Sequence, residues 1–417
     1  MSVIGQIHRT EYELEKDRSI PVIIAEAPGR IHFLGEQGES ESGFFLSGAI
    51  DRYIHLAVSQ RKDNSFRFFA SDLSERKRST LVNLKYRRED RWANCIKTAI
   101  FLFIDLGYPV KGLNFSFCGN IPHNIGLASS TAIETAAAVA LRSLFRVQIS
   151  DMELAKKLCE THLNLYNRPA AIVDYQICIL ARKEHFLVVD NYLGEIHKIK
   201  APLSSFRILL VDSRVPRFGA ESELSSRRAD SLKGLEFLSN KRGASGISFS
   251  ETSGKPEGRS FEEGTGFKDF ASTDLLEALG DFPEQIRRRT MHVVEEIRRV
   301  NDAGDALQRS DLASLAKIIF HSHESLRDLY EVSCPEVDWL VKRAQEIEGA
   351  AGARLTGLGF GGCTYTIIRR ELVEEYKKRL EEYERIFGFR PLIYEVRLAT
   401  GARVIPERRR VNANTAD

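Results

Sequence analysis

The chain has 417 residues, of which 43% are hydrophobic and 28% charged, so it is long enough to bury a large core and to form two domains. Its formal net charge of +2 creates no strong field for nucleic acid or a membrane surface, and we expect neither as a partner. No apolar run is long enough to span a bilayer, and the charged N-terminus lacks the apolar centre of a signal peptide.

Six cysteines are scattered along the chain, at positions 95, 118, 159, 178, 334 and 363, without a CxxC pair or the spacing of a metal site. This pattern is typical of reduced thiols inside a cell. We therefore expect a cytoplasmic protein.

The first third of the chain is rich in strand-forming residues. Apolar and β-branched residues between Gly, Asn, Asp or Ser predict strands within 21–36, 43–60, 65–70 and 113–121. Helices are predicted over 91–107, which stops at Gly107, and over 150–167. The second of these opens with Ser150 followed three residues later by Glu153, the pattern of a capping box.

A second cycle of strands and helices follows residue 200. The patterns predict a strand at 206–213, amphipathic helices around 287–301 and 311–329, and a strand followed by a helix within 363–388. Residues 240–268 are rich in Gly, Ser and charge without periodicity, so we expect a mobile surface insertion there. The sequence thus predicts an α+β chain with an extension at 1–19, an N-terminal domain at 20–200, a C-terminal domain at 201–405 and a tail at 406–417.

The stretch from Pro122 to Phe145 changes from a short polar turn with Gly and Ser to an alanine-rich run with helical periodicity. A strand ending near Ile121 would enter the turn, and a helix would begin near Ser130. Free N–H groups and the positive end of the helix dipole can bind phosphate at such a turn, and serine hydroxyls can bind Mg²⁺. The spacing is not that of a Walker A loop, so from these residues alone ordinary helix capping stays an alternative.

Two further motifs accompany this turn, EAPGRIHFLGEQGE at 26–39 and GARLTGLGFGGCTYTII at 352–368. In this order the three motifs resemble the GHMP family of small-molecule kinases. Matches at 91–100, 289–300 and 320–344 resemble its galactokinase branch, and the resemblance covers residues 20–405. It implies a two-domain GHMP kinase fold with the active site in the cleft between the domains. It also implies an ATP- and Mg²⁺-dependent sugar kinase that phosphorylates the anomeric hydroxyl of galactose or a related sugar.

The resemblance assigns roles to single residues. Arg30 would stabilise charge on the transferred phosphoryl group, although a lone arginine can also form a surface salt bridge. Asp174 would orient the sugar hydroxyl or accept its proton, or it could instead cap a helix. Trp92 would line the pocket for the nucleotide base or pack in the core. The predicted ATP-binding loop comprises Asn124, Gly126, Leu127, Ala128, Ser129 and Ser130, of which Ser130 would also bind Mg²⁺.

The predicted sugar pocket departs from the family pattern. The expected substrate contacts are Glu36, Gln37, Glu39, Asp174, Leu224 and Gly359. Gln37 and Glu39 stand where galactokinases have His and Asp, and Leu224 stands where they have a sugar-contacting tyrosine. Ala171 replaces a glycine shortly before the aspartate. Because sites built on hydroxyl contacts discriminate sharply, these changes leave the identity of the sugar open.

The predicted metal position is also open. The family's Mg²⁺-binding glutamate falls on His162, while a small gap in the alignment would restore Glu160 as the ligand. Two alternatives follow from these departures: a GHMP kinase for a uronic acid, amino sugar, other hexose or cyclitol, and a galactokinase-like sensor of sugar and ATP without efficient transfer. We expect a monomer whose partners are the sugar and ATP.

Overall fold

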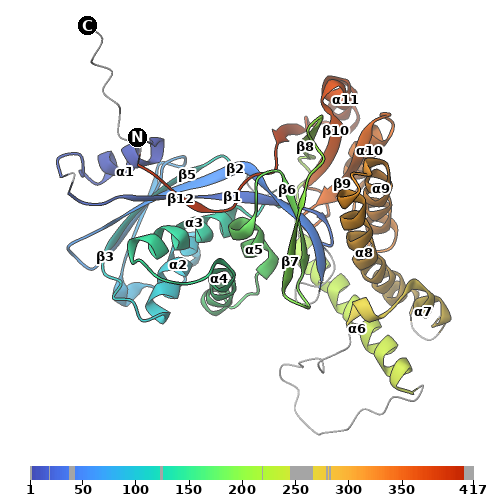
Figure 1. Cartoon of the computed structure of the whole chain (residues 1–417), viewed down its shortest axis with the longest axis horizontal. Helices are drawn as coiled ribbons and strands as arrows, with labels where there is room; N and C mark the ends of the chain where they lie inside the picture. Colours follow the sequence, from blue (N-terminus) through green and yellow to red (C-terminus); the bar gives the residue numbers. More distant parts are fainter. Residues whose placement is uncertain are drawn as a thin grey trace.

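The computed structural model describes residues 2–17, 19–36, 43–122, 125–217, 219–244, 266–278, 280 and 283–407. Gln37, Glu39 and Asn124 lie outside these residues, as do most of the expected insertion and most of the expected tail. The described part forms two units, each with one sheet and helices packed against it (Figure 1). This arrangement confirms the predicted α+β fold with two domains.

The first sheet contains eight of the described strands, in the order β12-β1-β2-β5-β3-β4, with β6 beside β2 and β7 beside β6. Its strands are β1 (Ile23–Leu34), β2 (Phe44–Gln60), β3 (Ser65–Ala70), β4 (Glu75–Thr80), β5 (Leu113–Gly119), β6 (His185–Asp190), β7 (Glu195–Lys200) and β12 (Arg403–Ile405). β1 is buried from Ile24 to Leu34 because α3 covers it and helices of the second unit reach its end. Polar side chains on β1 are therefore held in the interior.

The helices of the first unit are α1 (Val3–Glu11), α2 (Ala93–Asp105), α3 (Ser129–Leu144), α4 (Asp151–Tyr166) and α5 (Ile172–Leu180). α2 to α5 lie together on one side of the sheet, and α1 lies on the other side (Figure 1). α3 is buried from Thr131 to Leu141, because its alanines allow close packing against the sheet and α2. The serine half of the predicted capping box at α4 is confirmed, since the Ser150 hydroxyl accepts the N–H of Glu153.

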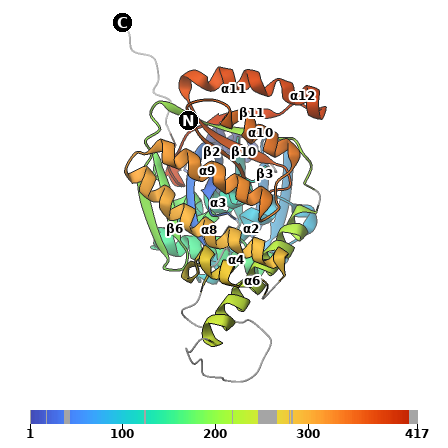
Figure 2. The same cartoon turned by 90° about the vertical axis from the view of Figure 1, so that its right-hand side faces the viewer.

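The second sheet has the order β11-β8-β10-β9. Its strands are β8 (Phe206–Asp212), β9 (Ala350–Thr356), β10 (Cys363–Arg369) and β11 (Leu392–Val396). Helices follow at α6 (Ala220–Ala244), α7 (Ser272–Glu277), α8 (Glu284–Gln308), α9 (Leu312–Asp328), α10 (Pro335–Gln345), α11 (Val373–Leu380) and α12 (Glu382–Phe387). α8, α9 and α10 form a layer over the end of the molecule (Figure 2). Within the ranges given above, no helix combines the length and apolarity needed to cross a membrane.

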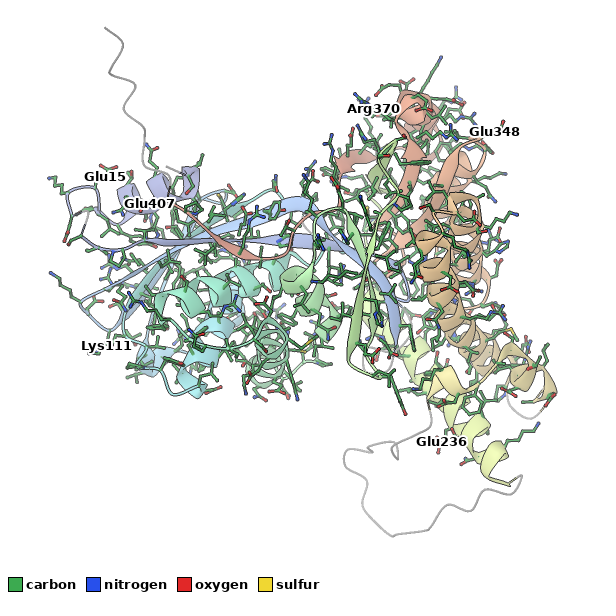
Figure 3. The ribbon with its side chains drawn as sticks, in the orientation of Figure 1. Glu15, Lys111, Glu236, Glu348, Arg370 and Glu407 are labelled. Carbon is green, nitrogen blue, oxygen red and sulfur yellow. The ribbon has the colours of Figure 1, made fainter. Side chains whose placement is uncertain are left out.

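The last strand returns to the first sheet. β12 pairs with β1 in antiparallel register, with Ile24 opposite Ile405. Beyond it, Glu407 accepts hydrogen bonds from Arg9 at the end of α1, the shorter of which is 2.8 Å (Figure 3). The predicted boundary at residues 200 and 201 falls in the connection between β7 and β8, and like the other domain limits it stays a prediction.

His8 on α1 gives the first sheet a dependence on pH. Its ring is fully buried, with Nδ1 3.0 Å from the Ser116 hydroxyl and Nε2 2.9 Å from the Ser59 hydroxyl. Burial, together with the charge of Arg9, lowers the pKa of His8 to about 3 from its ordinary 6.5. The folded state therefore disfavours the protonated ring, and stability present above the unfolded pKa is lost as the pH falls below it.

We predict that His8→Asn removes this dependence. The variant should be less stable than the parent at about pH 7.5. The difference in the free energy of unfolding should narrow by about 2 kcal/mol at about pH 5, because there His8 is protonated in the unfolded parent but not in the folded parent, and this stabilises the unfolded state. Urea unfolding of both proteins at the two pH values measures this difference. A gap that is independent of pH would contradict the assignment.

Candidate active site

Arg30 on β1 and Asp174 in the first turn of α5 form a bidentate ion pair. The Arg30 Nε atom donates to Asp174 Oδ1 over 2.6 Å, and Nη2 donates to Oδ2 over 2.9 Å. Both side chains are largely buried. Arg30 Nη1 also donates to the backbone oxygen of Gly126, and the Arg30 backbone N–H donates to that of Leu127. β1, α5 and the predicted phosphate loop therefore meet at one arginine, in place of the surface salt bridge that the sequence left open.

The surroundings of Asp174 keep its carboxylate ionised. Burial alone would raise its pKa, but the charge of Arg30 and the hydrogen bond from His32 outweigh burial and hold the pKa of Asp174 well below its usual range. The N-cap of α5 is Ala171, which provides no side-chain hydrogen bond, and Asp174 lies three residues further on. Its carboxylate is thus near the positive end of the helix dipole without being the cap.

His32 is a third member of this cluster that the sequence reasoning missed. Its Nε2 atom lies 3.0 Å from Asp174 Oδ1, and its Nδ1 atom lies 2.7 Å from the Ser47 hydroxyl. Burial and the nearby charge of Arg30 lower the pKa of His32, so the ring is neutral. Because a carboxylate can only accept, Nε2 carries the proton and Nδ1 accepts from Ser47. The sequence did contain one indication of His32, because side chains two residues apart in a strand point to the same face, which places His32 beside Arg30 on β1.

The predicted phosphate loop leads into α3 as expected. α3 begins at Ser129, and its N-cap residue Ala128 has a φ of 58° and provides no side-chain hydrogen bond. The first N–H groups of the helix are therefore not capped by the residue before it, which is the arrangement that binds phosphate oxygens. Leu127 is buried in the core, whereas the Ser130 side chain is exposed.

The glycine-rich motif after β9 lies against the phosphate loop. Gly126 and Gly357 both have φ near +90°, and a Cβ atom built on Gly126 would be 3.1 Å from the Cα of Gly357. At Gly359, a Cβ would come within 2.4 Å of the Val332 backbone oxygen. These contacts explain why glycine is needed where the two backbones meet. Two motifs from different domains thus form one surface.

Glu36, a predicted substrate contact, already has protein partners. Its Oε1 accepts from the Thr356 hydroxyl over 3.1 Å and from the Gly357 N–H, and its Oε2 accepts from Arg354 Nη1 over 3.0 Å. The carboxylate therefore joins the end of the first motif to the glycine-rich motif. The neighbouring Gln37 and Glu39 lie outside the described residues, so their predicted roles stay predictions.

The residues predicted to hold a metal ion have different surroundings. Glu160 is exposed on α4. His162 instead contacts α3, where its Nδ1 lies 2.9 Å from Glu134 Oε1, and its ring stacks on Tyr166. Glu134 also accepts from Tyr175, and burial raises its pKa. Among the described residues, no group of three or more His, Cys, Asp or Glu side chains could hold a metal ion.

Trp92 and Leu224 both have structural roles. The Trp92 indole N–H donates to Glu75 Oε2 over 2.9 Å, and its ring meets Phe117 edge to face. These contacts fit the core-packing alternative for Trp92, but the residue is only half-buried, and its place beside the nucleotide base stays a prediction. Leu224 on α6 is 3% exposed in an apolar cluster with residues of α8. A leucine there supplies no hydroxyl to a sugar.

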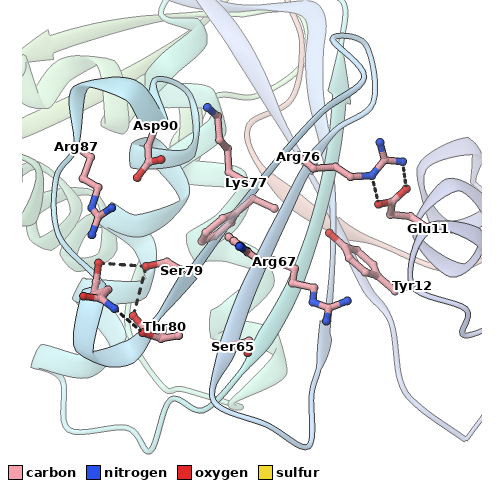
Figure 4. Close-up of a pocket in the computed structure, with 13 residues that line it drawn as sticks. Glu11, Tyr12, Ser65, Arg67, Arg76, Lys77, Ser79, Thr80, Arg87 and Asp90 are labelled. Atoms are coloured by element: carbon pink, nitrogen blue, oxygen red, sulfur yellow. Dashed lines mark hydrogen bonds and ion pairs between the residues drawn. The ribbon is translucent and has the colours of Figure 1, made fainter.

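A hollow of about 770 Å³ lies beside β3 and β4 (Figure 4), and neither Arg30 nor Asp174 lines it. Basic side chains line it, namely Arg67, Arg76, Lys77, Arg78 and Arg87. β4 is the edge strand of the first sheet, and charged side chains on an edge strand prevent pairing with other chains. This accounts for Arg76, Lys77 and Arg78, which lie on β4.

Comparisons with known proteins agree with this geometry. The galactokinase galactose-binding signature matches residues 8–60, the GHMP kinases N terminal domain matches 94–182, and GHMP kinases C terminal matches 305–385. A protein of Treponema pallidum (strain Nichols) is 38% identical over 97% of both chains. The galactokinase of Thermotoga maritima is 31% identical over 91% of this chain and 99% of its own.

Solved structures show the same fold. Lactococcus lactis galactokinase complexed with galactose superimposes with a TM-score of 0.84 at 23% identity, covering 97% of this chain and all of its own. A mevalonate kinase superimposes with a TM-score of 0.61 at 19% identity, covering 90% and 99%. The fold and the three matched segments are those of GHMP kinases. Within them, the chain belongs to the galactokinase family, and it is accordingly a sugar kinase, a phosphotransferase.

We predict that His32→Leu slows turnover by about tenfold or more, because it removes one charge-assisted hydrogen bond from Asp174 and one ring from the cluster. Steady-state kinetics at saturating substrates measures this effect. Ser47→Ala, which removes only the outer partner of the ring, is the control and should have a smaller effect. A His32→Leu loss no larger than that of Ser47→Ala would contradict a direct role for the hydrogen bond from His32 to Asp174.

Proposed function

We propose that this chain transfers the γ-phosphoryl group of ATP to the anomeric hydroxyl of galactose. The observation that carries the proposal is the Arg30–Asp174 pair, which joins the phosphate loop to the segment matching the galactose-binding signature. The Thermotoga maritima relative is named a galactokinase, and the Lactococcus lactis structure is of a galactokinase with galactose. Phosphoryl transfer depends on positioning and charge stabilisation more than on covalent catalysis, which suits this set of residues.

Asp174 orients the sugar hydroxyl and accepts its proton. Arg30 donates to both carboxylate oxygens, and His32 donates a second hydrogen bond to Oδ1, so Oδ2 keeps more capacity to accept from a hydroxyl. Because the pKa of Asp174 is held low, it is a weak base. It therefore aligns the hydroxyl first and takes the proton late, once the bond to phosphorus has begun to form.

Arg30 stabilises charge on the transferred group. A guanidinium has five N–H groups, and the contacts to Asp174 and Gly126 leave one N–H on each terminal nitrogen. The ion pair with Asp174 and the burial of the Arg30 side chain hold these two N–H groups in place. Preorganised donors of this kind stabilise developing charge without a cost of reorganisation during the reaction.

The start of α3 binds the phosphates of ATP. The uncapped N–H groups that begin at Ser129 and the helix dipole both favour negative charge. The exposed Ser130 hydroxyl suits Mg²⁺, which prefers oxygen ligands and takes several of them from water and substrate phosphates. When bound, the ion would neutralise phosphate charge. Glu160 is exposed as well and stays a predicted ligand of the same ion.

The setting of this reaction is part of the proposal. All six cysteines are free thiols, which supports a reducing, cytoplasmic compartment. A monomer is the simplest form consistent with a site built from one chain, since Arg30, Asp174 and Gly126 come from the same copy.

We predict ATP-dependent ADP release with galactose as acceptor, and a loss of about 10²- to 10⁴-fold in kcat on changing Asp174→Asn. Asp105→Asn at the exposed end of α2 is the matched control and should leave turnover unchanged. The assay includes glucose, uronic acids, amino sugars and inositols. Turnover only with one of these would keep the chemistry and replace the sugar, whereas ATP binding without turnover on any acceptor would support a sensor instead.

We predict that Ser130→Ala raises the Mg²⁺ concentration needed for half-maximal rate by about tenfold, because it removes one direct oxygen ligand. Ser129→Ala, one residue earlier in the same turn, should shift it less. A titration of initial rate against Mg²⁺ at fixed ATP measures both. A larger shift in the Ser129 variant would move the metal contact to that serine.

A further inference from the structure

A cluster of buried charges lies where the two domains meet, and the sequence reasoning assigned it no role. Arg354 on β9 and Glu296 on α8 are both 0% exposed, and Ser322 on α9 is also fully buried. Glu36, which follows β1, completes the cluster. These four residues come from three segments of the second unit and one of the first.

Each nitrogen of the Arg354 guanidinium has a partner. Nε donates to the Ser322 hydroxyl over 2.8 Å, and Nη2 donates to Glu296 Oε1 over 3.3 Å. Nη1 donates to Glu36 Oε2 over 3.0 Å and to the Leu355 backbone oxygen over 2.8 Å. One side chain thus links the end of the first motif to α8 and α9.

Glu296 holds the same segment by a second route. Its Oε1 accepts the backbone N–H of Gly35 over 3.1 Å, and its carboxylate accepts from the Ser322 hydroxyl. Arg299 Nη1 donates to its Oε2 over 3.0 Å. Burial would raise the pKa of Glu296, but the charges of Arg354 and Arg299 outweigh it and lower the pKa to about 2. The carboxylate is therefore charged whenever the protein is folded near neutral pH.

The segment at Gly35 and Glu36 is consequently fixed through both its backbone and its side chain. Gly35 has a φ of +90°, and a Cβ there would lie 1.8 Å from the Phe44 backbone oxygen, so the chain has no room to shift on that side. Glu36 also accepts from Thr356 and from the N–H of Gly357 in the glycine-rich motif. Three donors leave this carboxylate little capacity for a sugar hydroxyl.

Stability alone does not explain this cluster. Buried ion pairs often stabilise a fold no better than apolar side chains of similar size, because desolvation of the charges opposes their attraction. Here the two carboxylates accept hydrogen bonds from backbone N–H groups. Glu296 accepts from Gly35 and Glu36 accepts from Gly357, and these glycines belong to two motifs of the site. An apolar cluster could fill the same volume, but it could not hold those N–H groups in place.

We propose that Arg354 is a positioning residue that fixes Glu36, so that Gly35 and Glu36, which lie within the match to the galactose-binding signature, and the glycine-rich motif after β9 are held as one unit. The inference rests on the proposed function, because it predicts that Arg354 affects the affinity for galactose more than the affinity for ATP. Arg354 does not touch the reacting groups. It sets the affinity for the sugar through Glu36, while the ATP phosphates are held at the start of α3 and depend on it less.

Arg354→Lys tests this assignment, since lysine keeps the charge but its single nitrogen cannot occupy the three positions from which the guanidinium donates to Ser322, Glu36 and Glu296. We expect KM for galactose to rise by about tenfold, with KM for ATP changed by less than about twofold. Arg327→Lys makes the same change in an arginine of α9 that donates to Asp328, outside this cluster, and it should leave KM for galactose nearly unchanged. Equal increases in KM for both substrates of the Arg354 variant would overturn the proposal.

A double-mutant cycle with Glu36→Gln separates positioning from a general loss of stability. If Arg354 acts through Glu36, Arg354→Lys should have little further effect on KM for galactose in a protein that already carries Glu36→Gln. If the two residues act independently, the free-energy changes calculated from KM in the single variants should add up in the double variant. If Arg354→Lys does not fold, Thr356→Val removes a donor to Glu36 without touching a charge and enters the same cycle. Turnover of galactose by the parent tests the proposed function separately.

Discussion

The buried ion pair between Arg30 and Asp174 is the constraint on which the rest of the site depends. Two charges of opposite sign, each largely removed from water, are tolerated only while they remain paired, because an unpaired buried charge costs several kcal/mol. The pair therefore ties β1 to α5, and the contact from Arg30 to Gly126 extends that tie to the phosphate loop. The groups that would perform the chemistry are thus also the groups that fix its geometry.

The second domain enters this arrangement through backbone contacts and buried charge. Gly126 and Gly357 approach each other so closely that neither position has space for a side chain in an ordinary conformation. Next to them, Glu36 receives donors from β9 and the residue after it. A hinge motion between the domains would have to break these contacts together. The interface between the domains is therefore a part of the site.

Strands, helices and the three motifs could be predicted from the sequence because each depends on residues close together in the chain. The period of apolar residues predicted β8 and α8, and local capping predicted the start of α4 at Ser150. Arg30, Asp174 and the phosphate loop followed from motifs of known order. The return of β12 to the first sheet did not, because strand pairing across the whole chain leaves no local pattern.

The partners of the buried charges could not be predicted for the same reason. Glu36 and Arg354 are 318 residues apart in the chain, and Gly35 and Glu296 are 261 apart, so only the fold brings them together. His32 was within reach of strand periodicity, but its contact with Asp174 required the position of α5. Glu160 and Leu224 were chosen from the family resemblance. The direction in which each faces depends on its helix, and Glu160 is exposed to solvent whereas Leu224 is buried in the core.

A low pKa at Asp174 is consistent with catalysis once the order of events is considered. A stronger base would need a less charged environment, and removing the charge of Arg30 would also remove the donors for the phosphoryl group. In a loose transition state the sugar hydroxyl becomes acidic only as its oxygen bonds to phosphorus, so a weak base is sufficient at that stage. Under the proposed function, the site would act by positioning and charge stabilisation more than by basicity, and Arg30 would serve both.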